Sequence, residues 1–517
     1  MYSPPVYEGY RGSFCPGFAG ENMIDFIKIN QKDTVAVALR PLSRGTVLSV
    51  DGAEVILQED IPQAHKFALC DIAEGEPVIK YGARIGFAKE NIASGSWIHV
   101  HNLRTALGEV LEYQYHPEES ELKPSAPAEF MGYPRTDGRV GVRNEIWILP
   151  TVGCVNSIVR SFEAEAKRRF SLDAGVEDII SFNHPYGCSQ MGDDQENTRK
   201  VLADIIHHPN AAGVLVVGLG CENSNIPVLM EYIGDYDKDR IKFMSCQDFE
   251  DETEEAMKRI GEIYELAKME KRVPCDASKL VIGMKCGGSD GLSGITANPT
   301  VGAFSDLLIS KGGSTILTEV PEMFGAETLL MNRCKNEQIF EKTVKLINNF
   351  KEYFMRHDQT IYENPSPGNK KGGISTLEDK SLGCTQKSGS APVVDVLDYA
   401  ERIKESGLNL LSAPGNDLVA ATALAISGAQ IVLFTTGRGT PFATLVPTMK
   451  IASNSRLAGF KANWIDFNAG RMVEDQSGAE VAQDLFEYVL RVASGEKVKS
   501  EADGFRDIAI FKQGVTL

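Results

Sequence analysis

The sequence lacks any apolar run long enough to cross a membrane. Its longest runs, such as residues 214–217 and 431–434, have the length of a β-strand, whereas a membrane helix needs roughly 20 apolar residues. Residues 1–22 contain a single basic side chain, Arg11, and no continuous apolar stretch, so they do not fit a secretory signal. These absences predict a cytoplasmic protein with no membrane partner.

Basic residues are also in short supply. Lys and Arg total 53 against 71 for Asp and Glu, which gives a net charge of -18. A polyanion would be repelled by such a chain, so we predict no nucleic-acid partner. The 10 cysteines among 517 residues are too few and too scattered for a disulfide scaffold. Several adjoin glycine, which favours thiol or metal chemistry.

The length of the chain predicts several domains. Residues 1–22 are expected to be an N-terminal extension. After them, a short motif with one apolar residue and a tight turn recurs at 42–45, 61–64, 72–75 and 92–95. Short β-type runs lie between these turns, so residues 23–103 are expected to form a small all-β module. Residues 104–130 are expected to be a linker, because 116–129 are polar and contain proline. His65 lies in one turn and is either an acid–base or ligand residue or surface decoration.

The rest of the chain repeats one layout, in which a short apolar run ends in a glycine-rich polar turn. Continuous apolar runs are typical of strands buried on both faces, so a mostly parallel α/β sheet is expected. The runs are 212–217, 280–284, 315–317, 408–411 and 430–434. A scaffold helix is expected over 250–272, where Ala256, Ile260, Ile263 and Ala267 recur at helical spacing.

Polar side chains in these turns are candidates for one site. Ligands bind beyond the carboxyl ends of the strands in open α/β sheets, so the turns converge if their strands are neighbours. None of the turns is a dinucleotide fingerprint or a P-loop. The segment 364–373 carries Lys370 and Lys371 with two prolines and three glycines. We predict that it is neither helix nor central strand and that it holds an acidic substrate.

Cys188, Cys221 and Cys286 each adjoin glycine, but no pair has the CxxC spacing. With His184 they form a candidate iron site, either mononuclear Fe(II) or a three-thiolate cluster; the alternative is that they pack as small hydrophobic residues. Oxygen ligands from Glu222, Asp290 or Glu319 would instead suit a harder divalent ion.

Several motifs together resemble the altronate and galactarate dehydratase family, over residues 23–517. They are Gly141-Val-Arg-Asn144, Trp147-Ile-Leu-Pro-Thr-Val-Gly-Cys154, Tyr186-Gly-Cys-Ser189, Gly218-Leu-Gly-Cys-Glu222, the run from Cys286 to Pro299, Glu319-Val-Pro-Glu322, Asn364-Pro-Ser-Pro-Gly-Asn369 and the run from Phe434 to Pro441. His99-Val-His-Asn102 and the run from Glu378 to Gln386 resemble the altronate branch. The extension 1–22 is not part of the family's pattern.

The resemblance implies a hydro-lyase that converts D-altronate to 2-dehydro-3-deoxy-D-gluconate in hexuronate catabolism, with Fe(II) or Mn(II) as cofactor. It implies a β-clip or SAF domain over 23–103, a middle α/β dimerisation domain over 131–275, a Rossmann-like metal-binding catalytic domain over 276–517, and a homodimer. The alternatives are a D-galactarate dehydratase or sulfolactate-type lyase, and a sugar-acid-binding protein without catalysis.

Such a dehydration removes the C2 proton and expels hydroxide from C3, so it needs a base, an acid and a metal that polarises the substrate. For the metal we expect ligands from Cys286, Asp290, Glu319, Cys188, Cys221 and Glu222. For acid and base we expect His65, His184 and Lys370. For substrate binding we expect Asn298, Asn369, Gly437, Arg438, Gly439 and Thr440.

Overall fold

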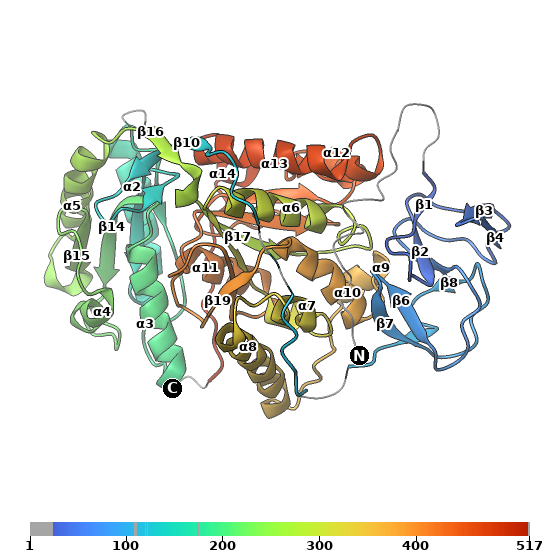
Figure 1. The fold of residues 1–517 in the computed structure, drawn as a ribbon. Coiled ribbons are helices and arrows are strands. Elements are labelled where there is room, and N and C mark those ends of the chain that lie inside the picture. The colour runs from blue at the N-terminus through green and yellow to red at the C-terminus, as the bar shows by residue number, and fades with distance from the viewer. Residues whose placement is uncertain (1–23, 108–110, 119, 121, 173–174, 515–517) are drawn as a thin grey trace.

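The chain forms three bodies in a row, and their order in space differs from their order in sequence. The computed structural model describes residues 24–107, 111–118, 120, 122–172 and 175–514. Figure 1 shows the N-terminal strands at one end, the middle segment at the other end and the C-terminal segment between them. Described residues of the connection after residue 104 lie against the central body. Leu107, Tyr113 and Tyr115 pack against the core of that body.

The N-terminal body is all β. Its nine strands form a four-stranded antiparallel sheet in the order β1-β2-β5-β8, a hairpin β3-β4 and a three-stranded antiparallel sheet β6-β7-β9. The bounds are β1 Phe26–Ile27, β2 Val35–Ala38, β3 Val47–Val50, β4 Ala53–Ile56, β5 Lys66–Ala68, β6 Pro77–Lys80, β7 Ala83–Ala88, β8 Trp97–Ile98 and β9 Leu103–Arg104. The predicted β-rich module is confirmed.

The recurring sequence motif of this body forms four equivalent turns. Gly45, Gly75 and Gly95 have φ between 80° and 83°, a region that favours glycine. The fourth turn has Ala64 at the same position, with φ 71°. A Cβ atom on Gly291 would lie 2.0 Å from the Ala64 carbonyl oxygen. The turn that departs from the glycine pattern therefore lies close to the C-terminal segment.

The middle segment forms a parallel sheet in the order β13-β12-β14-β15. Its strands are β12 Glu145–Pro150, β13 Asp178–Ser181, β14 Ala211–Gly218 and β15 Ile241–Ser245, and its helices are α2 Asn156–Arg169, α3 Gly192–Ile206, α4 Ile226–Ile233 and α5 Glu252–Ala267. A small antiparallel sheet joins this body to the next, with β10 Glu129–Pro134 between β11 Val140–Gly141 and β16 Val273–Asp276. The predicted scaffold helix is confirmed as α5, and its four periodic residues are buried.

The C-terminal segment forms a seven-stranded parallel sheet in the order β19-β20-β18-β17-β21-β22-β23. Its strands are β17 Val281–Cys286, β18 Ser314–Leu317, β19 Val393–Leu397, β20 Leu408–Leu411, β21 Ile431–Thr436, β22 Thr448–Ala452 and β23 Phe467–Asn468. Its helices are α6 Ala297–Ser310, α7 Glu327–Met331, α8 Glu337–Arg356, α9 Pro367–Lys371, α10 Leu377–Cys384, α11 Asp417–Ile426, α12 Ser455–Phe460, α13 Gly478–Ala493 and α14 Lys499–Ala502. The predicted parallel sheet is confirmed. In the described ranges, no helix is long and apolar enough to cross a membrane.

Two sequence predictions need correction here. β14 belongs to the middle sheet and not to the sheet of β20-β18-β17-β21, so the turns after the five apolar runs do not all meet. The segment 364–373 contains the short helix α9. Pro367 is tolerated there because it occupies the first turn, where its missing N–H has no helical partner, and Ser366 caps the helix by accepting the N–H of Asn369.

Buried ion pairs and a shared core hold the middle and central bodies together. Side chains of α3 and α11 pack in one apolar cluster. Arg143, beside the middle sheet, binds both carboxylate oxygens of Glu501 in α14 at 2.7 Å. Arg506 lies 3.0 Å from Glu145 and 3.1 Å from Glu501. Glu501 is thus an anion shared by two guanidinium groups at this junction.

Glu501 should make the free energy of unfolding depend on pH. Burial alone would raise its pKa, but Arg143 and Arg506 outweigh burial and lower the pKa to about 2. A depressed carboxyl pKa gives stability that is present above the unfolded value near 4.5 and lost as pH falls toward 2, a contribution of roughly 3 kcal/mol. We expect E501Q to unfold at lower urea concentration than wild type at pH 7 and to lose less stability between pH 5 and 3. E487Q, at an exposed position of α13, should show the same dependence of stability on pH as wild type. If the stability of E501Q fell with pH as steeply as that of wild type, the stabilising role of Glu501 would be contradicted.

Candidate metal and substrate site

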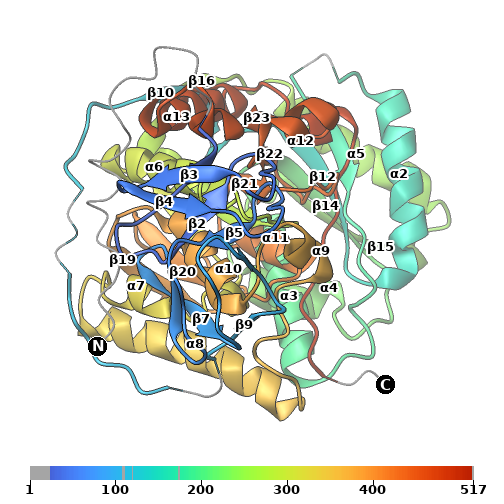
Figure 2. The ribbon, with the colours of Figure 1, turned by 90° about the vertical axis from the view of Figure 1, so that its right-hand side faces the viewer.

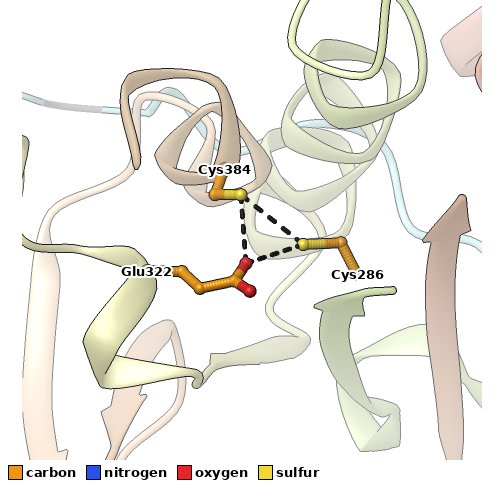
Figure 3. Close-up of side chains that lie close together, drawn as sticks. All are labelled: Cys286, Glu322 and Cys384. Atoms are coloured by element: carbon orange, nitrogen blue, oxygen red, sulfur yellow. Dashed lines mark hydrogen bonds between the residues drawn. The ribbon is translucent and has the colours of Figure 1, made fainter. Parts of the chain in front are cut away.

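Three buried side chains from separate elements of the central body meet at one point (Figure 3). Cys286 ends β17, Glu322 ends the short 3-10 helix Val320–Glu322 after β18, and Cys384 ends α10. The Glu322 Oε2 atom lies 3.0 Å from Cys286 Sγ and 3.2 Å from Cys384 Sγ, and the two sulfurs are 3.5 Å apart. Within the described residues, this is the group of Cys, His and acidic side chains close enough to share one ion.

Glu319 fixes the strand ends that carry two of these groups. Its backbone is left-handed, with φ 70°, which turns the chain sharply after β18. Its Oε2 atom accepts the N–H of Cys286 at 2.8 Å, and its Oε1 atom lies 2.8 Å from Lys285 Nζ. The carboxylate is therefore committed to holding β17 against the turn that carries Glu322. The structure places this predicted ligand beside the three-residue cluster rather than in it.

Three buried lysines surround the cluster. Lys380 Nζ lies 2.6 Å from the Oε1 atom of Glu322, and Lys285 pairs with Glu319 and Asp417. Burial alone would raise the pKa of Glu322, but Lys380 and Lys387 outweigh it and lower the pKa to about 2. Glu322 is therefore a carboxylate at neutral pH, and the lysines give the site a positive surrounding that favours anions.

The donor set fits a borderline-soft divalent ion. The hydrogen bond with Cys384 and burial raise the pKa of the Cys286 thiol well above its usual range, so the thiol must lose its proton when it binds a metal. Ligands of a tetrahedral ion with metal–sulfur bonds of about 2.3 Å lie about 3.8 Å apart. Separations of 3.0 to 3.5 Å approach this value. Two thiolates suit iron, and a carboxylate also accepts manganese.

The predicted substrate residues Asn298 and Asn369 hold the elements around the cluster. Asn298 donates to the Gly383 carbonyl at 2.9 Å and accepts from Thr435 at 2.7 Å, which positions the residue before Cys384. Asn369 donates to the Ser289 carbonyl at 2.8 Å, and its Oδ1 atom lies 3.4 Å from Lys380 Nζ. Both amides are buried.

A pocket of about 450 Å³ opens at the boundary with the N-terminal body. Arg438, Arg456 and Lys371 give it a cationic lining, with Asn454 and Asp290 at its wall. Gly437 also lines this pocket, and the turn continues through Gly439, whose N–H bonds Thr436, to Thr440, which accepts from Phe442. The pocket suits a small anion.

Asp290 links this pocket to the cluster but is occupied by structural bonds. Its carboxylate accepts from Ser293, from Ser453 at 2.8 Å and from Asn454 at 3.0 Å. A Cβ atom on Gly437 would lie 2.3 Å from its carboxyl carbon. Asp290 thus ties the loop after β17 to the turn after β21, and it lies outside the three-residue cluster.

The N-terminal body closes the site from one side. Figures 1 and 2 both show its strands against α9 and α10. Lys66 and Lys80 reach Asp379 of α10 at 2.8 and 3.0 Å, and all three side chains are buried. The predicted His65 lies at this boundary, where its Nδ1 atom accepts from Trp97 and its Nε2 atom faces the Lys371 carbonyl at 3.3 Å. Lys370 is half-buried at the end of α9.

The remaining predicted residues lie in the middle body, at the other end of the molecule (Figure 1). His184 is buried with Nε2 2.8 Å from the Pro150 carbonyl and Nδ1 accepting from Tyr186, and burial lowers its pKa to about 4. Glu222 accepts from Thr151 and from the N–H groups of its own turn. Cys188 and Cys221 follow β13 and β14. The structure does not bring them to Cys286, because they belong to a different sheet.

Sequence analysis missed Glu322, Cys384 and the lysines Lys285, Lys380 and Lys387 as site residues. Glu322 and Cys384 both lie in motifs that the sequence analysis quoted, at residues 319–322 and 378–384. The signal was present, but only the docking of α10 over the ends of β17 and β18 selects these side chains from their neighbours.

Comparison with known proteins agrees with this architecture. Family models described as altronate/galactarate dehydratase SAF domain, D-galactarate dehydratase/altronate hydrolase second domain, and D-galactarate/altronate dehydratase C-terminal match residues 24–106, 132–268 and 277–516. The chain is 52% identical over 495 residues to an altronate dehydratase of Escherichia coli (strain K12) and 53% identical over 497 residues to that of Bacillus subtilis (strain 168). Each match covers 96% of this chain and 100% of the relative.

A galactarate dehydratase (L-threo-forming) of E. coli is 34% identical over 493 residues, covering 91% of this chain and 93% of the relative. Matches of this extent span the β-rich body, the middle sheet and the central sheet that carries the buried cluster. The chain is therefore a member of the altronate and galactarate dehydratase family.

Proposed function

We propose that the protein is a metal-dependent hydro-lyase that dehydrates D-altronate to 2-dehydro-3-deoxy-D-gluconate. The observation that carries this proposal is the buried Cys286–Glu322–Cys384 cluster, and Asp290, in the loop after Cys286, lines a cationic pocket of about 450 Å³. Relatives named altronate dehydratase, at 52% and 53% identity over their full length, support altronate as the substrate.

The cofactor we propose is Fe(II), with Mn(II) as the alternative. Cys286, Glu322 and Cys384 would hold it, and the two sulfurs favour iron. When bound, a divalent ion supplies Lewis-acid stabilisation of the charge that develops on the sugar acid. Lys380 and Lys387 keep Glu322 ionised as a ligand, and Glu319 keeps the Cys286 end of β17 in place.

Other residues of the chain bind the substrate carboxylate, transfer the proton or position these groups. Arg438 and Arg456 bind the C1 carboxylate in the pocket, since two guanidinium groups suit a planar anion. Lys370 is our candidate to move the C2 proton, because α9 also carries Asn369, which contacts Ser289 and Lys380 beside the cluster. His65 orients Lys371 through its carbonyl and acts as a positioning residue.

The fold type of the C-terminal sheet, the oligomeric state and the cellular location are also part of the proposal. We propose that the C-terminal sheet is a Rossmann-like catalytic domain and that the middle body mediates a homodimer in the cytoplasm. The family membership supports these features.

Substrate choice tests the proposal. Anaerobically purified protein loaded with Fe(II) should form a 2-keto acid from D-altronate and much less from D-galactarate, because a second carboxylate needs a further cationic contact. Turnover of D-galactarate alone would reassign the protein to the sister activity. Absence of turnover on both acids, with Fe(II) or Mn(II), would reject the proposal.

Replacing Arg438 should weaken substrate binding more than it slows chemistry. A charged hydrogen bond contributes roughly 1.5 to 3 kcal/mol, so R438Q should raise KM for D-altronate about 10- to 100-fold with a smaller change in kcat. R160Q, on an exposed helix face of the middle body, is the matched control and should keep both constants. An unchanged KM in R438Q would show that Arg438 does not bind the C1 carboxylate of the substrate.

A further inference from the structure

Four cysteines lie at the carboxyl ends of the strands of the middle sheet, one after each parallel strand. Cys154 follows β12, Cys188 follows β13, Cys221 follows β14 and Cys246 directly follows β15. The carboxyl ends of neighbouring parallel strands lie side by side, about 4.8 Å apart per strand. The sheet order β13-β12-β14-β15 therefore places the four cysteine-bearing turns in a row, each beside the next, at the other end of the molecule from α10 and Cys384 (Figure 1).

Direct contacts join these turns in a continuous series. Gly153 donates its N–H to the Tyr186 carbonyl at 2.9 Å, which connects the turns of Cys154 and Cys188. Cys188 Sγ lies 3.2 Å from Asn223 Oδ1, in the turn of Cys221. The Gln247 side-chain amide lies 4.0 Å from Cys221 Sγ, and the Gln247 backbone N–H donates to the Leu219 carbonyl, which connects the turns of Cys221 and Cys246.

The backbone of these turns is shaped for close approach. Gly187, next to Cys188, has φ 100°, and a Cβ atom there would lie 1.9 Å from the Thr151 carbonyl oxygen. Gly220, next to Cys221, has φ 126°. Cys154 and Cys221 are exposed, and Cys188 and Cys246 are half-buried against the apolar cluster of Val152, Val155 and their neighbours. The thiols thus border an apolar floor and remain open to reagents from solvent.

The four sulfurs are not arranged to share a single ion. All four thiols are free, and within the described residues no three of these sulfurs lie within 4.8 Å of one another. A single tetrahedral ion would need its sulfurs about 3.8 Å apart. In a four-iron cluster each of the four thiolates binds a different iron atom, and inorganic sulfide bridges the irons, so the thiolates stand farther apart.

We propose that Cys154, Cys188, Cys221 and Cys246 bind an iron–sulfur cluster in the middle body, separate from the Cys286–Glu322–Cys384 site. Assembly needs ferrous iron and sulfide, and each thiol gives up its proton on binding iron. The Gln247 amide, which points at Cys221 Sγ, donates a hydrogen bond to a ligand sulfur. None of these four cysteines takes part in the proposed dehydration.

The test uses the full chain, purified without oxygen and incubated with Fe(II) and sulfide. Wild type should retain acid-labile sulfide after desalting and show the broad visible absorption of sulfide-to-iron charge transfer. C154S/C221S should lose nearly all of both signals, and since both side chains are exposed, its fold should persist. C246S provides an independent second variant with the same expected loss.

Two controls separate this site from others. C70S removes an exposed thiol of the N-terminal body and should keep the sulfide. C286S/C384S should also keep it while losing dehydratase turnover, so failure of the proposed function and failure of the cluster are distinguishable. No acid-labile sulfide in wild type, zinc bound in place of iron, or sulfide retained in C154S/C221S would each overturn the proposal.

Discussion

E322Q is expected to lower the turnover of D-altronate by about 10³-fold or more. The substitution removes the one carboxylate that lies within 3.2 Å of both Cys286 and Cys384 and leaves a neutral amide in its place. A ligand that stabilises developing charge contributes several kcal/mol, and each 1.4 kcal/mol changes the rate tenfold. Turnover and bound Fe(II) should be measured on the same anaerobic sample, with circular dichroism as the check of fold.

E327Q is the matched control for this variant. Glu327 is also a buried carboxylate paired with a buried lysine, Lys351, at 3.4 Å, but it lies outside the cluster. Both variants leave an ammonium group without its anion, so both should lose stability. Only E322Q should lose turnover and the Fe(II) held by Cys286, Glu322 and Cys384. Equal turnover in the two variants would show that Glu322 has no part in the reaction.

D379N is expected to loosen the N-terminal body from the rest of the molecule. Asp379 accepts from Lys66 and Lys80, and all three side chains are buried. Burial alone would raise the pKa of Asp379, but the two lysines outweigh it and hold the pKa far below its usual range. Removing the anion leaves two buried ammonium groups, which costs about 3 to 5 kcal/mol. Thermal unfolding and hydrogen exchange of β2, β5 and α10 measure the effect.

Turnover should fall in D379N as well, because α10 also carries Lys380 and Cys384. The triple variant K66M/K80M/D379L replaces the whole network with apolar side chains of similar length. Such replacements are often neutral or stabilising, so the triple variant should recover most of the lost stability. A melting temperature in D379N equal to that of wild type would contradict the docking role of this network.

Local patterns predicted five strands of the two parallel sheets but not their assignment to sheets. The apolar runs 280–284, 315–317, 408–411 and 430–434 became β17, β18, β20 and β21, four neighbours in one sheet. The run 212–217 has the same pattern yet forms β14 of the other sheet. Every parallel strand buried on both faces looks alike in sequence, and the choice between two sheets depends on contacts far along the chain.

The site shows the same limit at the level of single side chains. Cys286 follows directly from its position at a strand end before glycines. Glu319 and Glu322 are three residues apart in one segment, and only the left-handed turn at Glu319 decides which carboxylate joins the cluster. Cys384 approaches because α10 is held by Asp379 against the N-terminal body. Contacts of this kind have no local signature.

The central claim is that dehydration requires a metal held at Cys286, Glu322 and Cys384. Its most direct test is the rate of 2-keto acid formation from D-altronate by chelator-treated, metal-free protein, before and after anaerobic addition of Fe(II). We predict no product without metal and restored turnover with Fe(II) in wild type but not in C286S/C384S. Product formed at full rate by the metal-free protein, or by C286S/C384S, would contradict the claim.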